Sequence, residues 1–407
     1  MGSIALMGTL DSKGEEFSFL REAVLKRGIP VLTINIGTLG PPAFPPDLDL
    51  GLRGKLAREE AVERVLKAAR AEVIGLQKRG EICGLISCGG GTGTHMATAV
   101  MRDLPVGFPK VMVSTVASRD LSEIVSTCDI TMIHSVADLV GINSVTGKIL
   151  DQAAAAICAM ARARWEPPSR RGSIAMTNFG FVSEAAQRIR ELLENKGYEV
   201  VVFHANGTGG RAMEEMAARG FFNAILDLAL HELADDMFGG YCQGAGKARL
   251  CPGRGKALPR LIVPGGLDCA VLQFTKHSVP EAYRDRKLFF YDFRSAIGLE
   301  PQESARLGED LAARIKNYPA PIRILVPALG WSEADGPGMP LHDPGSREAL
   351  LSALEGALPP DFKIRRVEAH INQESFALEA VRLMEELLQE AGNDCKKLDA
   401  EGSCKYS

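Results

Sequence analysis

The sequence predicts an α/β protein of two doubly wound, Rossmann-like lobes with mostly parallel sheets. Three observations support this: a length of 407 residues, the alternation of apolar runs with helical patterns, and an N-terminal pattern that returns after residue 170. We expect one lobe at 1–165 and a second at 172–392, with a ligand cleft between them. The polar, Pro-rich stretch 166–171 is the expected linker, and the polar tail 393–407 is expected to fray.

The bulk composition is that of an ordinary globular protein. The chain is 46% hydrophobic and 24% charged, and its net charge is −4. This balance indicates neither a nucleic-acid partner nor a membrane surface, and no apolar run reaches the roughly 18 residues of a membrane span. The N-terminus lacks the features of a signal peptide, and the nine cysteines form no CxxC pair. We therefore expect reduced thiols and a cytoplasmic location.

The first lobe opens with a βαβ pattern. An apolar run at 4–7 stops at Gly8, a helical pattern covers 15–27, and a second apolar run covers 31–34. Gly28 follows the helix as a C-terminal cap would. Further helices are expected over 58–79, 95–102 and 143–162, and further strands over 82–88, 110–114 and 129–133. Such alternation predicts a parallel sheet that is covered on both faces.

The second lobe repeats the opening pattern of the first. Residues 172–175 read Gly-Ser-Ile-Ala, as residues 2–5 do. The offset between the two segments is 170 before the first loop and 169 after it, which favours an internal duplication over chance similarity. Strands are then expected over 200–203, 224–228, 260–263, 288–291, 322–326 and 363–367, and helices over 211–219, from 230, and over 300–316, 346–356 and 373–391.

A Gly-rich loop after the strand at 82–88 is the strongest candidate for a ligand site. It reads Gly89-Gly90-Gly91-Thr92-Gly93-Thr94. Glycines allow positive φ and let backbone N–H groups approach an anion, and the following helix N-terminus adds partial positive charge. The loop is neither a Walker A motif nor a GxGxxG motif with a later acidic anchor. We interpret it as an anion or phosphate site rather than a plain turn.

A second candidate loop joins the first strand to the first helix. Gly8, Thr9, Asp11 and Lys13 supply a turn, a hydroxyl, a carboxylate and a cation. Thr9 and Lys13 suit a phosphate, and Asp11 suits Mg²⁺ or a ligand hydroxyl. Helix capping is an equally good interpretation of Asp11. Because ligands bind at the carboxyl ends of parallel strands, both loops are expected at one edge of the sheet.

The second lobe carries a loop of similar chemistry after its second strand. Its residues are Asn206, Gly207, Thr208, Gly209, Gly210 and Arg211. Arg211 suits a carboxylate or phosphate, so we expect contact with an anionic substrate, although a turn with an exposed arginine fits the same pattern. Other polar residues, including His231, His342 and His370, show no recognised metal-binding spacing, and we assign no metal ligands.

Several phrases of the sequence resemble one family. They are Gly8-Thr9-Leu10-Asp11-Ser12-Lys13, 89–94, 109–118, 203–214, 232–235 and 370–372. Together they are similar to an uncharacterised ATP-binding family whose plant member is the tomato mosaic virus resistance protein, an inhibitor of viral RNA replication. The phrases follow one another through most of the chain.

The resemblance implies two α/β subdomains, ATP and Mg²⁺ bound in the first, and a homodimer or higher homo-oligomer. By resemblance, the nucleotide would contact Gly8, Thr9, Asp11, Lys13 and the 89–94 loop, together with Ser114 and Thr115. The sequence departs from the family pattern at 177–184, 228–231 and 341–344, all in the second lobe. The substrate of that lobe would therefore differ from that of typical members. The antiviral role is not carried over, because it depends on one viral partner.

These patterns favour an ATP-binding protein that also holds an anionic small molecule near the second lobe, and that acts, if it is an enzyme, as a transferase, ligase or hydrolase. Two other functions stay open. One is a nucleotide-gated regulatory module without turnover, since no nucleophile or base is recognisable. The other is a metal-dependent hydrolase or lyase that uses His231, His342 or His370.

Overall fold

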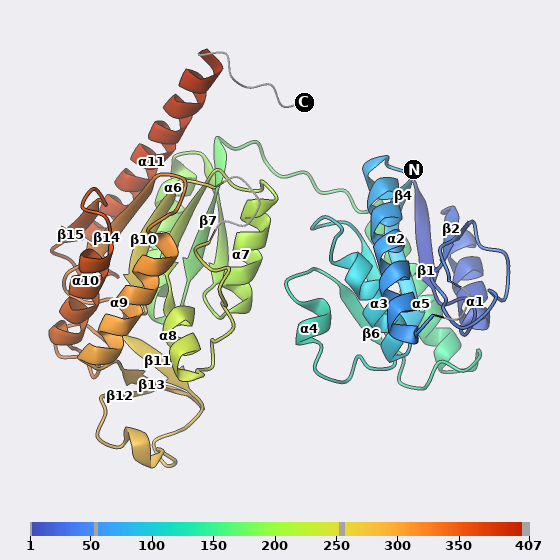
Figure 1. Cartoon of the computed structure of the whole chain (residues 1–407), viewed down its shortest axis with the longest axis horizontal. Helices are drawn as coiled ribbons and strands as arrows, with labels where there is room; N and C mark the ends of the chain where they lie inside the picture. The colour runs from blue at the N-terminus through green and yellow to red at the C-terminus, as the bar shows by residue number, and fades with distance from the viewer. Residues whose placement is uncertain (1, 53–55, 252–256, 401–407) are drawn as a thin grey trace. The chain divides into compact units, whose positions relative to one another are not determined.

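A computed structural model describes residues 2–52, 56–251 and 257–400, with side chains up to residue 391. The chain divides into two compact units, Met1–Pro167 and Pro168–Ser407 (Figure 1). Each unit contains one six-stranded sheet with parallel pairing. The predicted fold class, two Rossmann-like α/β lobes with mostly parallel sheets, is therefore confirmed.

Unit one has the strand order of a dinucleotide-binding fold. Its sheet runs β3-β2-β1-β4-β5-β6. The strands are β1 (Ser3–Gly8), β2 (Val31–Asn35), β3 (Leu48–Asp49), β4 (Ile82–Gly89), β5 (Lys110–Ser114) and β6 (Thr131–His134). The helices are α1 (Gly14–Leu25), α2 (Arg58–Lys78), α3 (Gly91–Met101), α4 (Ser122–Val125) and α5 (Thr146–Arg162).

Helices cover both faces of this sheet, as the continuous apolar strands require. Successive side chains of a strand point to opposite faces. Ile4 and Leu6 of β1 therefore pack in one core with residues of α1 and α5, whereas Ala5 and Met7 pack in another with residues of α2 and α3. Burial on both faces leaves the strand ends as the place where polar groups gather.

Unit two combines a second parallel sheet with a small antiparallel one. Its main sheet runs β15-β14-β10-β9-β7-β8, and the small sheet runs β11-β13-β12. The strands are β7 (Gly172–Asn178), β8 (Tyr198–His204), β9 (Ala224–Ala229), β10 (Arg260–Gly265), β11 (Cys269–Leu272), β12 (Leu288–Phe290), β13 (Ser295–Gly298), β14 (Ile322–Pro327) and β15 (Ile364–Val367). The helices are η1 (Gly180–Val182), α6 (Ser183–Asn195), α7 (Thr208–Ala218), α8 (His231–Phe238), η2 (Glu281–Tyr283), α9 (Pro301–Ile315), α10 (Pro344–Ala357) and α11 (Glu374–Ala400).

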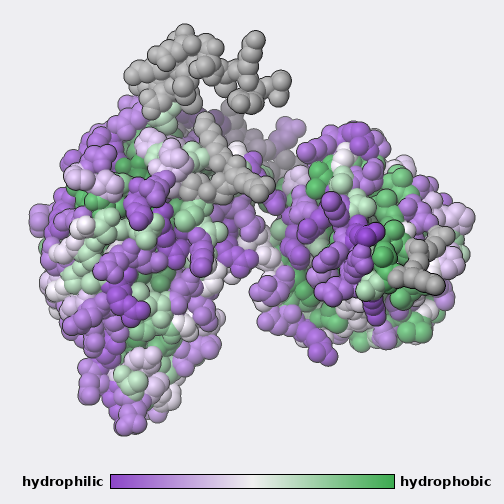
Figure 2. Space-filling model, viewed as in Figure 1, coloured by the Kyte–Doolittle hydropathy of each residue, from purple (hydrophilic) through white to green (hydrophobic). Residues whose placement is uncertain are grey.

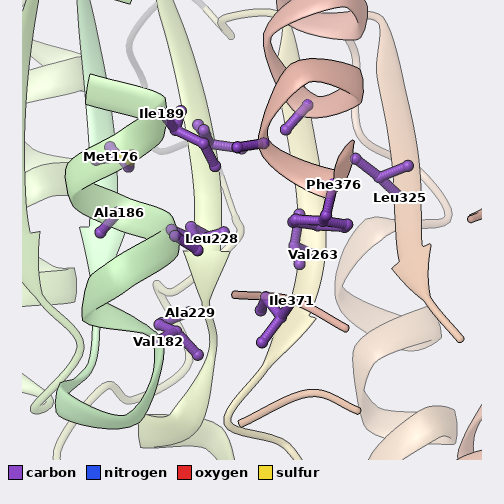
Figure 3. Close-up of a cluster of buried hydrophobic side chains, with 14 of the residues drawn as sticks. Met176, Val182, Ala186, Ile189, Leu228, Ala229, Val263, Leu325, Ile371 and Phe376 are labelled. Carbon is purple, nitrogen blue, oxygen red and sulfur yellow. The ribbon is translucent and has the colours of Figure 1, made fainter. Parts of the chain in front are cut away.

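The largest core of unit two lies between its sheet and the pair α6 and α11. Figure 3 shows Ile189 of α6 and Phe376 of α11 pointing toward strand residues that include Leu228 and Val263. On the opposite face, α8, α9 and α10 share a second core with β10 and β14, and α7 packs on β7 and β9. Hydrophilic residues cover much of the visible surface of each unit (Figure 2).

The first two strands pair in the same register in both units. Ile4 of β1 pairs with Val31 of β2 in unit one, and Ile174 of β7 pairs with Val200 of β8 in unit two. These residues differ by the same offsets, 170 and 169, that relate the two sequence segments. The repeated segment therefore folds into the same βαβ unit twice.

The structure differs from the expected elements at three places. Helix α3 begins at Gly91 and not at residue 95, because the glycines of the loop adopt the first helical turn. Helix α11 continues to Ala400, so the tail predicted to fray from residue 393 is partly helical, and 401–407 lie outside the described residues. The short strands β11 and β13 were missed, since four residues give little pattern.

Candidate functional site

A pocket of about 180 Å³ lies in unit one where β1 and β4 end. Its lining consists of Thr9, Asp11, Ser12, Lys13, Thr38, Leu39, Arg58, Gly90, Gly91, Thr92 and Gly93. The strands β1 and β4 are neighbours from which the chain continues in opposite directions, to β2 on one side and to β5 on the other. This is the topological switch point, where ligands bind in open α/β sheets. The two loops singled out in the sequence thus meet in one pocket.

The glycines of the 89–94 loop leave the backbone accessible to a ligand, but they do not adopt positive φ angles. None of Gly89, Gly90, Gly91 and Gly93 has a positive φ, so that part of the prediction was wrong. Gly89 is needed for packing, because a Cβ there would lie 3.2 Å from the Cα of Gly93. At Gly91 a Cβ would meet no described atom within 4 Å. The loop therefore leaves the backbone open to an incoming group.

The first turn of α3 presents its amides to this pocket. Among the described residues, no side chain caps the helix at Gly90, and the amide of Thr94 donates to the Gly90 carbonyl at 2.8 Å. The amides that precede it belong to Gly91, Thr92 and Gly93, which line the pocket. The first N–H groups of a helix have no partner inside the helix and carry the positive end of its dipole. This arrangement suits an anion.

Two cationic side chains border the same pocket. Lys13 donates from Nζ to the carbonyl oxygen of Leu139. Arg58, the first residue of α2, donates from a terminal guanidinium nitrogen to Oγ1 of Thr92 at 3.3 Å. Sequence reasoning missed Arg58. A positive charge in the first turn of a helix interacts unfavourably with the helix dipole. The position of Arg58 at the start of α2 was therefore the one sequence signal of a functional role.

Asp11 has one carboxylate oxygen that accepts hydrogen bonds and one that has no partner among the described residues. Its Oδ2 accepts hydrogen bonds from the amides of Leu39 at 2.7 Å and Gly40 at 3.2 Å. Its Oδ1 is buried and has no hydrogen-bond partner among the described residues. Lys13 occupies the N-cap position of α1, so the interpretation of Asp11 as a helix cap was wrong. A buried carboxylate oxygen without a donor is costly, and a cation in the pocket would remove that cost.

Five of the predicted contact residues lie beside the pocket and do not line it in the described part of the chain: Gly8, Gly89, Thr94, Ser114 and Thr115. The buried hydroxyls of Thr94 and Ser114 bond to each other at 2.7 Å, which ties α3 to β5. The amide of Thr115 donates to the Gly89 carbonyl at 3.2 Å. At Gly8 a Cβ would lie 1.8 Å from the Phe17 ring. These residues shape the strand ends.

In unit two, an internal carboxylate lies against the predicted anion loop 206–211, which joins β8 to α7. The amide of Gly207 donates to Oε2 of Glu232 at 2.7 Å. A Cβ on Gly210 would lie 2.0 Å from Oε1 of the same carboxylate, so glycine is required there by Glu232. Glu232 thus lies where an external anion was expected.

The remaining residues of this loop are bound locally or lie at its surface. Oδ1 of Asn206 accepts from the amide of Gly209 at 3.0 Å. Thr208 begins α7 and is exposed, and Arg211 lies half-buried in the same helix. The loop therefore closes on itself and on Glu232.

Glu232 belongs to a buried cluster of ion pairs that sequence reasoning missed. Arg249 lies 2.6 Å from Glu232, 2.9 Å from Glu214 and 2.6 Å from Asp227, and Arg260 lies 2.7 Å from Glu214 and 3.1 Å from Asp227. Burial opposes ionisation, yet Arg260 and Arg249 lower the pKa of Glu214 to about 2. Burial raises the pKa of Glu232. Three acids facing two arginines explain why one carboxyl of the cluster is harder to ionise.

Two more buried carboxylates follow the ends of β10 and β14. Oδ2 of Asp268 accepts from the Ser332 hydroxyl at 2.6 Å, and Asp335 pairs with Arg347. Burial and the neighbouring Asp268 raise the pKa of Asp335 to about 7. Burial also raises the pKa of Asp268. Carboxyl groups that titrate near neutral pH are concentrated at functional sites.

The three histidines of the metal-hydrolase hypothesis are not brought together as ligands. Nδ1 of His342 bonds to a backbone carbonyl at 2.8 Å, and Nε2 of His370 bonds to another at 2.9 Å. His231 lies instead with Asp235 and Cys242, whose potential ligand atoms all lie within 4.8 Å of one another. Among the described residues, this is the one group of three or more such side chains that could hold an ion.

The fold defines a two-lobed, Rossmann-like α/β protein with a pocket at the switch point of its first sheet. The chain belongs to the UPF0261 family. Residues 2–166 match the N-terminal domain of the Uncharacterised protein family (UPF0261), and residues 171–388 match its C-terminal domain.

Relatives match nearly the whole chain. A UPF0261 protein of Clostridium tetani is 35% identical over 394 residues, which cover 92% of this chain and 96% of that protein. The ToMV susceptible protein tm-1(GCR26) of Solanum lycopersicum is 27% identical and covers 97% of this chain, which spans 57% of the tomato protein. Among solved structures, the S. aureus MnaA-UDP co-structure is 11% identical with a TM-score of 0.25, over 64% of this chain and 79% of that one. A likeness that distant does not bear on function.

None of the helices in the described residues combines the length and the apolar character that crossing a bilayer requires.

Proposed function

We propose that unit one binds ATP together with Mg²⁺ in the pocket where β1 and β4 end. The observation that carries this proposal is the uncapped first turn of α3, which shares one pocket with Lys13, Arg58 and the unpartnered oxygen of Asp11. Backbone amides and two cations suit phosphate oxygens, and a carboxylate suits the metal ion that accompanies them.

The size of the pocket limits which part of the nucleotide it would hold. Its 180 Å³ is below the roughly 300–1,000 Å³ of common small-molecule pockets. We therefore place the phosphate chain in the pocket and the nucleoside outside it. Lys13 and Arg58 would neutralise phosphate charge, and Asp11 would hold Mg²⁺, which keeps most of its ligands as phosphate oxygens and waters.

Calorimetric titration of the full chain with ATP, with and without Mg²⁺, tests the proposal. We expect saturable binding that Mg²⁺ strengthens. Gly91→Val should remove binding, because its side chain projects into open space where a phosphate would sit and meets no described protein atom. Gly180→Val is a matched control, since a Cβ at Gly180 in unit two also meets no described atom within 4 Å. Undiminished binding by the Gly91 variant would refute the site.

The proposal is confined to nucleotide binding in unit one. Glu232 already accepts the Gly207 amide, so the geometry of the 206–211 loop lends no support to an anionic small molecule there. Phosphate release from bound ATP distinguishes an enzyme from a nucleotide-gated regulatory module. Release above background that is lost in Asp11→Asn would establish an ATP-dependent transferase, ligase or hydrolase.

We also propose that the chain works as a homo-oligomer in the cytoplasm. Val136 and Val140 in unit one are 69% and 76% exposed and lie within four residues of each other, which gives an assembly an apolar contact. The seven cysteines whose side chains the structure describes are free thiols, as a reducing compartment allows. Light scattering of the eluted protein tests the assembly, and a monomer at all concentrations would exclude it.

A further inference from the structure

We propose that unit two binds a structural zinc ion through His231, Asp235 and Cys242. This site is separate from the nucleotide pocket of unit one and does not depend on it. Imidazole, carboxylate and thiolate are the ligand types that zinc prefers, whereas a hard cation such as Mg²⁺ binds thiolates poorly.

The fold brings these side chains together from three neighbouring segments. His231 and Asp235 lie four residues apart in α8, so they share one face of the helix. Cys242 lies four residues after the end of α8, and Cys269 is the first residue of β11. Potential ligand atoms of His231, Asp235 and Cys242 all lie within 4.8 Å of one another, and the buried Cys269 is a neighbour of His231.

The tautomer of His231 requires a proton or a metal ion at its second ring nitrogen. Nδ1 lies 2.9 Å from the carbonyl oxygen of Gly266, and a carbonyl accepts only, so Nδ1 carries a proton. Nε2 then faces Oδ1 of Asp235 at 3.3 Å, and among the described residues it has no partner with hydrogen-bond geometry. A bare nitrogen lone pair against a carboxylate oxygen is repulsive. Either a proton or a metal ion must lie between them.

The hydrogen bonds of His231 and Asp235 match those that residues make when they bind a metal ion. A metal-bound histidine almost always donates its other ring N–H to a carbonyl or carboxylate, as His231 does to Gly266. The carboxylate of Asp235 accepts from the amides of Val271 and Cys242, each at 2.7 Å. These bonds orient the carboxylate and leave each oxygen a lone pair for coordination.

Burial and charge favour the metal over the proton. His231 and Asp235 are 0% exposed, and Cys242 is 2% exposed. A zinc ion with the Asp235 carboxylate, the Cys242 thiolate and the neutral His231 imidazole has no net charge, so the group can be buried without an unpaired ion. A proton alone would also neutralise His231 and Asp235, but it gives no reason for two thiols to converge there.

A buried site of this kind would hold parts of unit two together. The ligands connect α8 with the segment after it, and Asp235 accepts a hydrogen bond from Val271 of β11. Phe179 stacks on the His231 ring with centroids 3.8 Å apart. Zinc binding contributes directly to folding when the ligands are this buried. We therefore assign a structural role and no reaction to the ion.

Metal analysis of the full chain tests the site. The protein is produced with zinc in the medium, purified under reducing conditions without chelator, and analysed by inductively coupled plasma mass spectrometry. We expect close to one zinc per chain. Replacement by Co²⁺ should give a thiolate-to-cobalt charge-transfer absorption, which requires a cysteine ligand. Less than a tenth of an equivalent of zinc after reconstitution, with no such absorption, would show that a proton bridges His231 and Asp235.

Variants locate the ion. Cys242→Ser should lose zinc stoichiometry and the cobalt absorption, whereas Cys158→Ser, at a buried thiol of α5 in unit one, should keep both. If the Cys242 variant is insoluble, the spectrum of the cobalt-loaded wild type still decides whether a thiolate binds the ion. Full zinc content in the Cys242 variant would overturn the assignment. ATP binding by unit one is measured separately, so the two proposals fail independently.

Discussion

Unit one leaves space at the carboxyl ends of its first strands, whereas unit two fills the equivalent space with side chains. The registers of β1 against β4 and of β7 against β9 give Gly84 and Ala224 equivalent places. Counting forward along each strand, Gly91 corresponds to His231. The first is exposed beside a pocket, and the second is fully buried.

The first loops differ in the same way. By the offset of 170, Asp11 of unit one corresponds to Phe181 of unit two. Asp11 lines a pocket, while Phe181 is packed in the core with Phe179, which covers His231. The same βαβ unit thus leaves a pocket in unit one and packs side chains in its place in unit two. Open backbone amides are available to a ligand, and buried side chains at the same places bind one another.

The largest expected effect follows from the charges that unit two buries. Arg249→Met removes a fully buried guanidinium from Glu214, Asp227 and Glu232 and leaves those acids without enough positive charge. Removing one partner of a buried ion pair costs about 3–5 kcal/mol of unfolding free energy. Urea unfolding followed by circular dichroism measures the change.

The matched control lies in unit one. Arg58→Met removes an exposed arginine, and such surface changes stay within about 0.5 kcal/mol. Equal destabilisation by the two variants would mean that the buried cluster carries no more of the stability than a surface residue does.

Much of the fold was predictable because the main strands are buried on both faces. Long apolar runs such as 82–88 have no other stable place than the centre of a parallel sheet. The Gly-rich loop was equally visible, since four glycines in five positions exceed what a turn needs. The offset between Ile4 and Ile174 revealed the repeated βαβ unit directly.

The residues that make up each site were harder to predict than the fold, because distant segments of the chain bring them together. Glu232 and Arg249 are 17 residues apart and look like ordinary helix and loop charges until the fold buries both. Arg58 reaches the pocket from the start of another helix. Cys242 and Cys269 share no motif spacing. A sequence shows which groups exist, but burial decides which of them must pair.

A second test compares two glycines whose surroundings differ. Gly210→Ala places a Cβ 2.0 Å from the Glu232 carboxylate, and the helix or the carboxylate must move. Overpacking of this kind costs about 1–3 kcal/mol. Gly91→Ala meets no described atom and should be neutral or slightly stabilising, since alanine favours helices. Thermal unfolding of both variants measures the difference, and an unaffected Gly210 variant would contradict the packing described for Glu232.

The raised pKa of Asp335 predicts a pH dependence that belongs to unit two. The folded state holds this proton up to about pH 7, whereas an ordinary aspartate releases it near 3.8. The folded chain therefore binds more protons across this window, and stability falls as the pH rises through it. Between pH 6 and 8 the loss is about 1.4 kcal/mol. Asp335→Asn should lack this component in urea titrations at each pH. The same slope in the variant would assign the effect to another group.

The smallest expected effect concerns the unpartnered carboxylate oxygen of Asp11 in unit one. Asp11→Asn keeps one carbonyl oxygen as an acceptor for the Leu39 amide but replaces the other oxygen with an NH₂ group, which cannot bind Mg²⁺. We expect about fivefold weaker ATP binding with Mg²⁺, close to 1 kcal/mol, and no weakening in excess EDTA. Calorimetry under both conditions separates the metal from the phosphate contacts. Equally weakened ATP binding under both conditions would mean that Asp11 only positions the 38–40 segment. The pocket would then bind phosphate through the α3 amides, without an ion held by the Asp11 carboxylate.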